Sequence, residues 1–145
     1  MAITQAVCTS FKKELAEGRH HIKSGVGDTI KIALYTNEAT LNADTTLYSI
    51  DNEIPTTVDT GYVGGGKVLT VLDAGYDKDV YLIDFDDVTW GGAKFTCRGA
   101  LIYNDTAAGR VIAVLDFKKD QTVTDGTFTI KFPAATVKDS ILRIK

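Results

Sequence analysis

The apolar residues of this 145-residue chain change their spacing near Gly25 and Gly27. Before these glycines, apolar residues recur every four positions, and after them apolar and polar residues alternate in short runs. A repeat close to 3.6 residues is typical of an α-helix that buries one face, whereas a repeat of two is typical of a half-buried β-strand. The chain is therefore predicted to begin with one amphipathic helix and to continue as a mainly β structure.

The predicted helix occupies most of residues 1–24 and has about four turns, which is near the usual length in globular proteins. Its apolar stripe consists of Ile3, Val7, Phe11 and Leu15. Gly18 is the residue expected to end the helix, because glycine adopts the left-handed conformation common after a helical C-terminus. The stripe needs a partner surface, either the chain's own sheet or a neighbouring subunit.

Residues 28–35 read as the first strand, with Ile30, Ile32 and Leu34 on one face. Further strands are predicted at residues 68–72, 80–85, 94–103, 111–117, 127–132 and 141–144, with turns at 73–75, 104–109 and 125–126. A parallel sheet would need crossover helices, which the pattern lacks. We therefore predict one domain over residues 1–145, in which 28–145 form an antiparallel β-sandwich or jelly-roll-like barrel.

Residues 37–66 form a long, polar, threonine-rich connection with one short strand expected near residues 47–50. Connections of this length inside a domain are unusual and often functional. We call this segment the excursion. It ends in Gly61–Lys67, GYVGGGK, which has most of a P-loop but continues with Val68 where Mg²⁺ binding requires Ser or Thr. We interpret Gly64–Gly66 as a turn or bulge and not as a phosphate site.

Charge and composition argue against some classes of partner and some locations. The formal net charge is −3 and the pI is near 5.3, which argues against nucleic acid as a partner. No apolar run is long enough to span a membrane, and the N-terminus lacks the pattern of a secretory signal, so synthesis in a cytoplasm is expected. Cys8 and Cys97 are read as reduced, partly buried thiols, although a single disulfide stays an alternative. No cofactor is predicted.

Candidate catalytic and metal-binding residues are few. Asp84, Asp86 and Asp87 have the oxygen ligands that Ca²⁺ prefers, but the spacing is not that of an EF-hand, so a solvated turn is favoured. His20 and His21 are adjacent and make a poor joint metal site, since neighbouring residues of a strand point to opposite sides. No nucleophile motif is present. The chain is predicted to hold no metal and to have no catalytic residues.

Two further residues allow a structural and a binding interpretation. Trp90, the single tryptophan, either closes one end of the sandwich, which we favour, or anchors an interface. Arg98 stands within an otherwise apolar strand, and Asp84 or Asp116 is its expected ion-pair partner. We read this pair as structural.

Several segments together resemble small virion structural proteins of tailed bacteriophages. They are DTIKIALYT at 28–36, TGYVGGG at 60–66, DVTW at 87–90 continuing to CRGALIYN at 97–104, VLDF at 114–117 and GTFTI at 126–130. The resemblance is to capsid decoration (cement) proteins first. It implies a non-enzymatic protein on the capsid exterior, bound to the major capsid protein at subunit junctions and self-associating as a dimer or trimer.

The alternative is an adhesion module of a tail, neck or fibre, which would present Tyr62, Tyr76 and Trp90 to a host glycan or protein. In the cement hypothesis, the N-terminal segment and the excursion make most intersubunit contacts. The expected interface residues are Ile3, Val7, Phe11, Leu15, Tyr48, Tyr62 and Trp90. Removal of residues 1–24 is then expected to leave a folded sandwich that no longer joins capsids.

Overall fold

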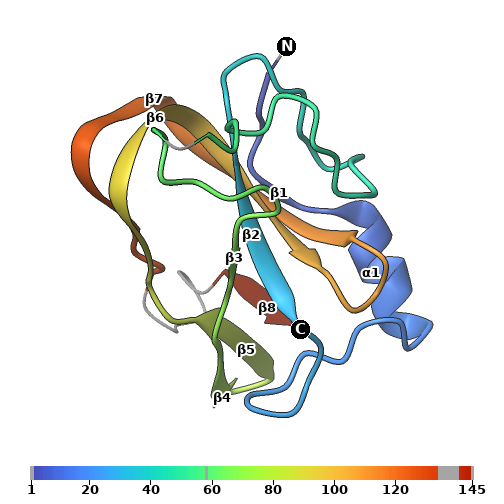
Figure 1. The fold of residues 1–145 in the computed structure, drawn as a ribbon. Coiled ribbons are helices and arrows are strands. Elements are labelled where there is room, and N and C mark those ends of the chain that lie inside the picture. The colour runs from blue at the N-terminus through green and yellow to red at the C-terminus, as the bar shows by residue number, and fades with distance from the viewer. Residues whose placement is uncertain (1, 58, 134–140, 145) are drawn as a thin grey trace.

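The computed structural model of the chain describes residues 2–57, 59–133 and 141–144 (Figure 1). Its helix is α1 (Thr9–Ala16). Its strands are β1 (Ala6–Val7), β2 (Ile30–Tyr35), β3 (Lys67–Val68), β4 (Val71–Asp77), β5 (Val80–Phe85), β6 (Val88–Asn104), β7 (Arg110–Ile130) and β8 (Leu142–Ile144). The prediction of a mainly β, sandwich-like fold with one N-terminal helix is confirmed.

The strands form two sheets. A five-stranded sheet has the order β1-β7-β6-β2-β3, and a three-stranded sheet has the order β4-β5-β8. All pairs between these strands are antiparallel, as predicted from the missing crossover helices. Figure 1 shows β8 and β5 lying across one side of the large sheet, with α1 beside it. Apolar residues of both sheets and of α1 join in one core.

The large sheet is buried on both faces, which the alternating pattern did not predict. On β2, Ile30, Ile32 and Leu34 share the core with the three-stranded sheet, but Ala33 and Tyr35 on the opposite face are also buried. The excursion covers this second face. Its Ile54 N–H donates to the Leu34 carbonyl at 3.0 Å. The excursion is therefore a packed layer of the fold and not a protruding arm.

The N-terminal helix is half as long as predicted. It has eight residues, while Ala6 and Val7 pair with Val114 and Ala113 of β7 and Ile3 forms a bridge with Leu41. Ile3 and Val7 are β-branched, which favours extended backbone, and their four-residue spacing misled the helix prediction. No helix among the described residues has the length and apolar character needed to cross a membrane.

Gly18 ends the helix as predicted. Its φ angle is 75°, its N–H donates to the Leu15 carbonyl, and the Arg19 N–H donates to the Glu14 carbonyl. These two bonds form a Schellman motif, which satisfies carbonyl groups that the last helical turn leaves unpaired. The chain then turns back along the sheet, which brings His20 under the helix.

Several predicted turns are irregularities within longer strands. The turn at 125–126 is wrong, because β7 runs without interruption through Gly126, which lies opposite Ala93 of β6. The turn at 73–75 is a bulge in β4, and the chain reverses after Asp77 instead, where Lys78 has a φ angle of 58°. Residues 47–50 form no strand, only a bridge from Leu47 to Arg110. The hairpin at 104–109 and the C-terminal strand are confirmed.

Gly66, the last of the three consecutive glycines, lies where the backbone passes very close to β2. Its φ angle is 81°, and a Cβ at this position would lie 1.8 Å from the Ile32 carbonyl oxygen. Only glycine lets β3 approach β2 this closely. The interpretation of Gly64–Gly66 as a turn is confirmed, since residues 64–65 form a turn directly before β3.

Candidate functional site

One carboxylate holds the excursion together. Glu53 is buried, and its two oxygens accept three hydrogen bonds from separate parts of the excursion. Tyr48 Oη donates to Oε1 at 2.5 Å, while Tyr62 Oη and the Gly65 N–H, at 2.8 Å, donate to Oε2. Residues 48, 53, 62 and 65 are thus gathered around one negative charge, and we call this cluster the clasp.

The clasp is also attached to the large sheet. Tyr62 Oη accepts a hydrogen bond from the Leu34 N–H of β2 at 3.0 Å. Tyr103 of β6 donates to the Gly65 carbonyl at 2.6 Å, and its ring stacks on Tyr48 with centroids 4.5 Å apart. Tyr35 of β2 donates to the Ser49 carbonyl at 2.6 Å. These bonds fix the path of the excursion over the sheet.

The tyrosines of the clasp act as donors. Burial raises the pKa of Tyr62 and Tyr48 well above the ordinary value, and their hydrogen bonds to Glu53 raise it further. Burial likewise raises the pKa of Tyr103 to about 12. Phenols with such pKa values stay protonated near neutral pH, so they serve neither as general bases nor as nucleophiles. The arrangement stabilises a loop and offers no group for bond making.

The surface next to the clasp is hollowed and apolar. A hollow of about 510 Å³ is lined by Lys31, Tyr48, Ile50, Gly64, Gly65, Tyr103, Asp105, Ala108 and Gly109. Val63 precedes a lining glycine and is 68% exposed, while Val68 pairs with the lining Lys31 and is 60% exposed. Val63 and Val68 thus adjoin the hollow through chain connectivity and strand pairing, and exposed apolar side chains that form one patch mark protein-binding surfaces. We call Val63, Val68 and the hollow beside them the clasp surface.

A second buried polar network joins α1 to the β6–β7 hairpin. Glu14 Oε1 lies 2.9 Å from His20 Nε2, and Glu14 Oε2 accepts from Arg110 Nη1 at 2.9 Å. The Asn104 amide group lies 3.0 Å from His20 Nδ1 and donates to Asp28 Oδ2 at 2.8 Å. His20 thus contacts Glu14 through Nε2 and Asn104 through Nδ1. The network links α1, the connection after it and the β6–β7 hairpin.

Glu14 makes this network pH-dependent. Burial raises the pKa of Glu14, but hydrogen bonds from His20 and Arg110 outweigh it and hold the pKa below the ordinary value of 4.5. A carboxyl group with a lowered pKa stabilises the fold above its unfolded-state pKa, and this contribution disappears as the pH falls through the folded-state pKa. The stability advantage over a Glu14→Gln variant should therefore be constant near neutral pH and shrink below pH 4.5. Urea unfolding at a series of pH values measures it, and an advantage independent of pH would contradict this role.

Four of the predicted interface residues are wholly or partly buried and pack inside the fold. Trp90 and Tyr62 are each 1% exposed, and Phe11 is 2% exposed. Trp90 packs between Tyr62 and Phe128, so the interpretation of Trp90 as an internal plug is confirmed. Tyr48 is half-buried in the clasp. None of the three fully buried rings is accessible to a partner in this conformation, which corrects their assignment to an interface.

The remaining interface candidates also face inward. Ile3, Val7 and Leu15 are half-buried and pack against the core, because the N-terminal segment covers one side of the sandwich. The predicted stripe of Ile3, Val7, Phe11 and Leu15 is apolar and packs, but it packs against the chain's own sheet. This is one of the two partners that the pattern left open.

The candidate metal ligands and cysteines named from the sequence do not form a site among the described residues. Asp84 is buried in β5, whereas Asp86 and Asp87 are exposed after it. Within residues 2–57, 59–133 and 141–144, no three His, Cys, Asp or Glu side chains stand close enough to share a metal ion. Cys8 and Cys97 are free and buried. The disulfide alternative is therefore wrong in this structure.

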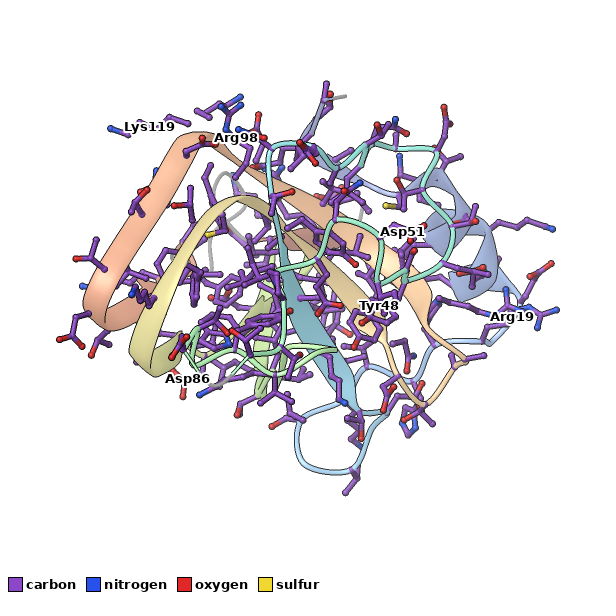
Figure 2. All side chains as sticks on the ribbon, turned by 45° about the horizontal axis from the view of Figure 1, so that its top comes forward. Arg19, Tyr48, Asp51, Asp86, Arg98 and Lys119 are labelled. Carbon is purple, nitrogen blue, oxygen red and sulfur yellow. The ribbon has the colours of Figure 1, made fainter. Side chains whose placement is uncertain are left out.

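Arg98 pairs with a residue that the sequence analysis did not consider. Its Nε lies 3.0 Å from Asp120 Oδ1, and neither Asp84 nor Asp116 is its partner. The reason is a wide irregularity in β7 between the pairs Cys97–Gln121 and Gly99–Asp116, which moves Asp120 beside Arg98. Figure 2 shows Arg98 and Lys119 where the β6–β7 ribbon bends, far from Tyr48 and Asp51 on the excursion.

Comparisons with known proteins leave the family open. We found no match among protein-family models, among curated proteins or among solved structures.

Proposed function

We propose that this chain is a non-enzymatic structural protein of a bacteriophage virion, and that it acts as a decoration protein on the outside of the capsid. The segments that resemble such proteins suggest the class. The single observation that carries the proposal is the clasp surface, where exposed valines stand on a loop that buried hydrogen bonds hold in place. A surface that is already ordered loses little conformational entropy when it binds.

The proposed partner is the major capsid protein. Many copies bound to a repetitive shell make a modest contact effective, because every copy restrains neighbouring subunits. The clasp suits this role, since it ties the binding loop to β2 and β6 and would transmit load into the sheet. In this proposal, Val63 and Val68 lie against the shell.

The adhesion alternative has less support in the structure. It relied on Tyr62, Tyr76 and Trp90 as a platform for a glycan or host protein. Tyr62 and Trp90 are buried, and only Tyr76, which is 80% exposed, is open to a ligand. A single exposed ring, tilted against Tyr81 with centroids 5.2 Å apart, is a small platform for sugar recognition.

A binding experiment on shells tests the proposal. Purified chain is added to capsids assembled without it, and bound protein is measured after sedimentation. Val63→Asp should weaken binding by about tenfold, because a charge is placed in an apolar contact. The control is Val26→Asp, since Val26 is equally exposed, at 68%, in a different connection.

Electron cryomicroscopy of the same particles supplies the second readout. Density for the chain on the icosahedral shell is the expected result. If the chain is found only on tails, or if it binds shells equally well with Val63→Asp and with Val26→Asp, the decoration role of the clasp surface is wrong.

A further inference from the structure

An apolar concavity lies between α1 and β8. This groove has a volume of about 720 Å³ and is lined by Val7, Phe11, Lys12, Leu15, Ala16, Ile141, Leu142, Arg143 and Ile144. Phe11 and Leu142 form a buried floor, and Ile144, which is 40% exposed, forms part of the rim. The charged residues in the lining are Lys12 and Arg143, and both are cationic. The groove therefore suits an apolar group that carries negative charge beside it.

The excursion has the complementary character. Residues 37–66 contain no Lys, Arg or His, and their acids are Glu38, Asp44, Asp51, Glu53 and Asp59. Glu53 is buried and accepts the hydrogen bonds of the clasp, while the other four acidic residues are exposed. Three large apolar side chains among the described residues of the same segment are also exposed: Leu47 at 55%, Ile50 at 73% and Val63 at 68%.

The turn at residues 50–53 presents these groups in a fixed shape. The Glu53 N–H donates to the Ile50 carbonyl at 3.1 Å, and Asn52 has a φ angle of 63°. The turn ends on the carboxylate of the clasp, so its position relative to the sheet is set by buried hydrogen bonds. Ile50 and Asp51 are thus exposed on a turn of fixed shape, and each also lines a hollow: Ile50 lines the one beside the clasp, and Asp51 lines one of about 350 Å³.

We infer that the turn at residues 50–53 of one copy docks into the α1–β8 groove of a second copy. Ile50 fills the groove against Leu15 and Ile144, and Asp51 lies beside Lys12. Figure 1 shows part of the excursion at the upper right and β8 near the centre of the view, and no described residue of the excursion is among those lining the groove. The two surfaces differ, so the contact is head-to-tail and builds a ring or an open row of copies. The contact needs no capsid, but Ile50 also lines the hollow of the clasp surface, so shell binding and self-association would use neighbouring residues.

Analytical ultracentrifugation over a wide range of concentrations tests the contact. The unaltered chain is expected to self-associate, and Ile50→Ser should weaken association by about tenfold or more, because burial of this side chain is lost. The matched control is Val63→Ser, which removes a similarly exposed aliphatic group from the clasp surface. Self-association should be unchanged in this control.

Charge reversal identifies the two sides. Lys12→Glu and Asp51→Lys should each weaken self-association by about tenfold, since each turns an attraction into a repulsion. A mixture of the two variants should associate again, because every junction then joins opposite charges. The control for Lys12→Glu is Lys23→Glu, an exposed lysine outside the groove.

Three outcomes would overturn the inference. The first is that the unaltered chain stays monomeric at all concentrations. The second is that Ile50→Ser self-associates as strongly as the unaltered chain. The third is that Asp51→Lys has no effect on self-association, as in a contact between two grooves. The shell-binding experiment with Val63→Asp has its own readout, so failure of one proposal is distinguishable from failure of the other.

Discussion

A chain that begins at residue 25 is expected not to fold cooperatively. Removal of residues 1–24 deletes β1 from the edge of the large sheet and takes α1 away from the core, where Phe11 is 2% exposed and Cys8 is fully buried. It also removes His20 and Glu14, which leaves Asn104 and Arg110 without these partners. Loss of one buried Phe side chain costs about 3–5 kcal/mol, and a domain has about 5–15 kcal/mol in total.

Circular dichroism during heating measures this loss. The truncated chain should show no sharp transition and no near-ultraviolet signal from packed aromatic rings. The control is full-length Phe11→Ala, which should keep a sharp transition at a lower temperature. A truncated chain that melts cooperatively would restore the initial expectation of an independent sandwich with a removable N-terminal arm.

Glu53→Ala is expected to lower the free energy of unfolding by about 2–4 kcal/mol, as buried donors left without an acceptor are costly. The substitution deprives Tyr48 Oη, Tyr62 Oη and the Gly65 N–H of a shared acceptor. Because these groups belong to separate parts of the excursion, the loop should loosen before the sheets do. Urea unfolding measures the total, and amide hydrogen exchange at Gly65 reports the loop.

Two variants make this result interpretable. Glu38→Ala removes an exposed carboxylate from the same segment and should change stability by less than about 0.5 kcal/mol. Glu53→Gln keeps one acceptor oxygen but points an NH₂ group at a donor, so its stability should lie between those of Glu53→Ala and the unaltered protein. If Glu53→Ala and Glu38→Ala are equally stable, the clasp does not hold the excursion.

The fold was predictable where short-range patterns dominate. The alternation at 28–35 and the loop at 104–109 identify β2 and the β6–β7 hairpin, because strand pattern and turn residues agree there. The glycine at 126 suggested a turn, yet β7 continues through it beside a register shift. A bulge and a turn use similar residues, so local sequence does not separate them.

The clasp was not predictable for a different reason. Its members lie up to 17 positions apart within the excursion, from Tyr48 to Gly65, and they complete their bonds on Leu34 and Tyr103 of the sheet. No period or motif relates such positions. The one available signal was a glutamate followed directly by Ile54 and Pro55, which is too common to identify a buried carboxylate.

The outer strands of the large sheet, β1 and β3, have two residues each. A strand this short offers hardly any backbone ladder to an approaching chain, so uncontrolled edge-to-edge growth finds little to extend. Where such molecules crowd together, contact must be made by side chains of matching shape and charge. The two short margins therefore limit edge-to-edge pairing of the large sheet, whereas β4, an outer strand of the small sheet, has seven residues.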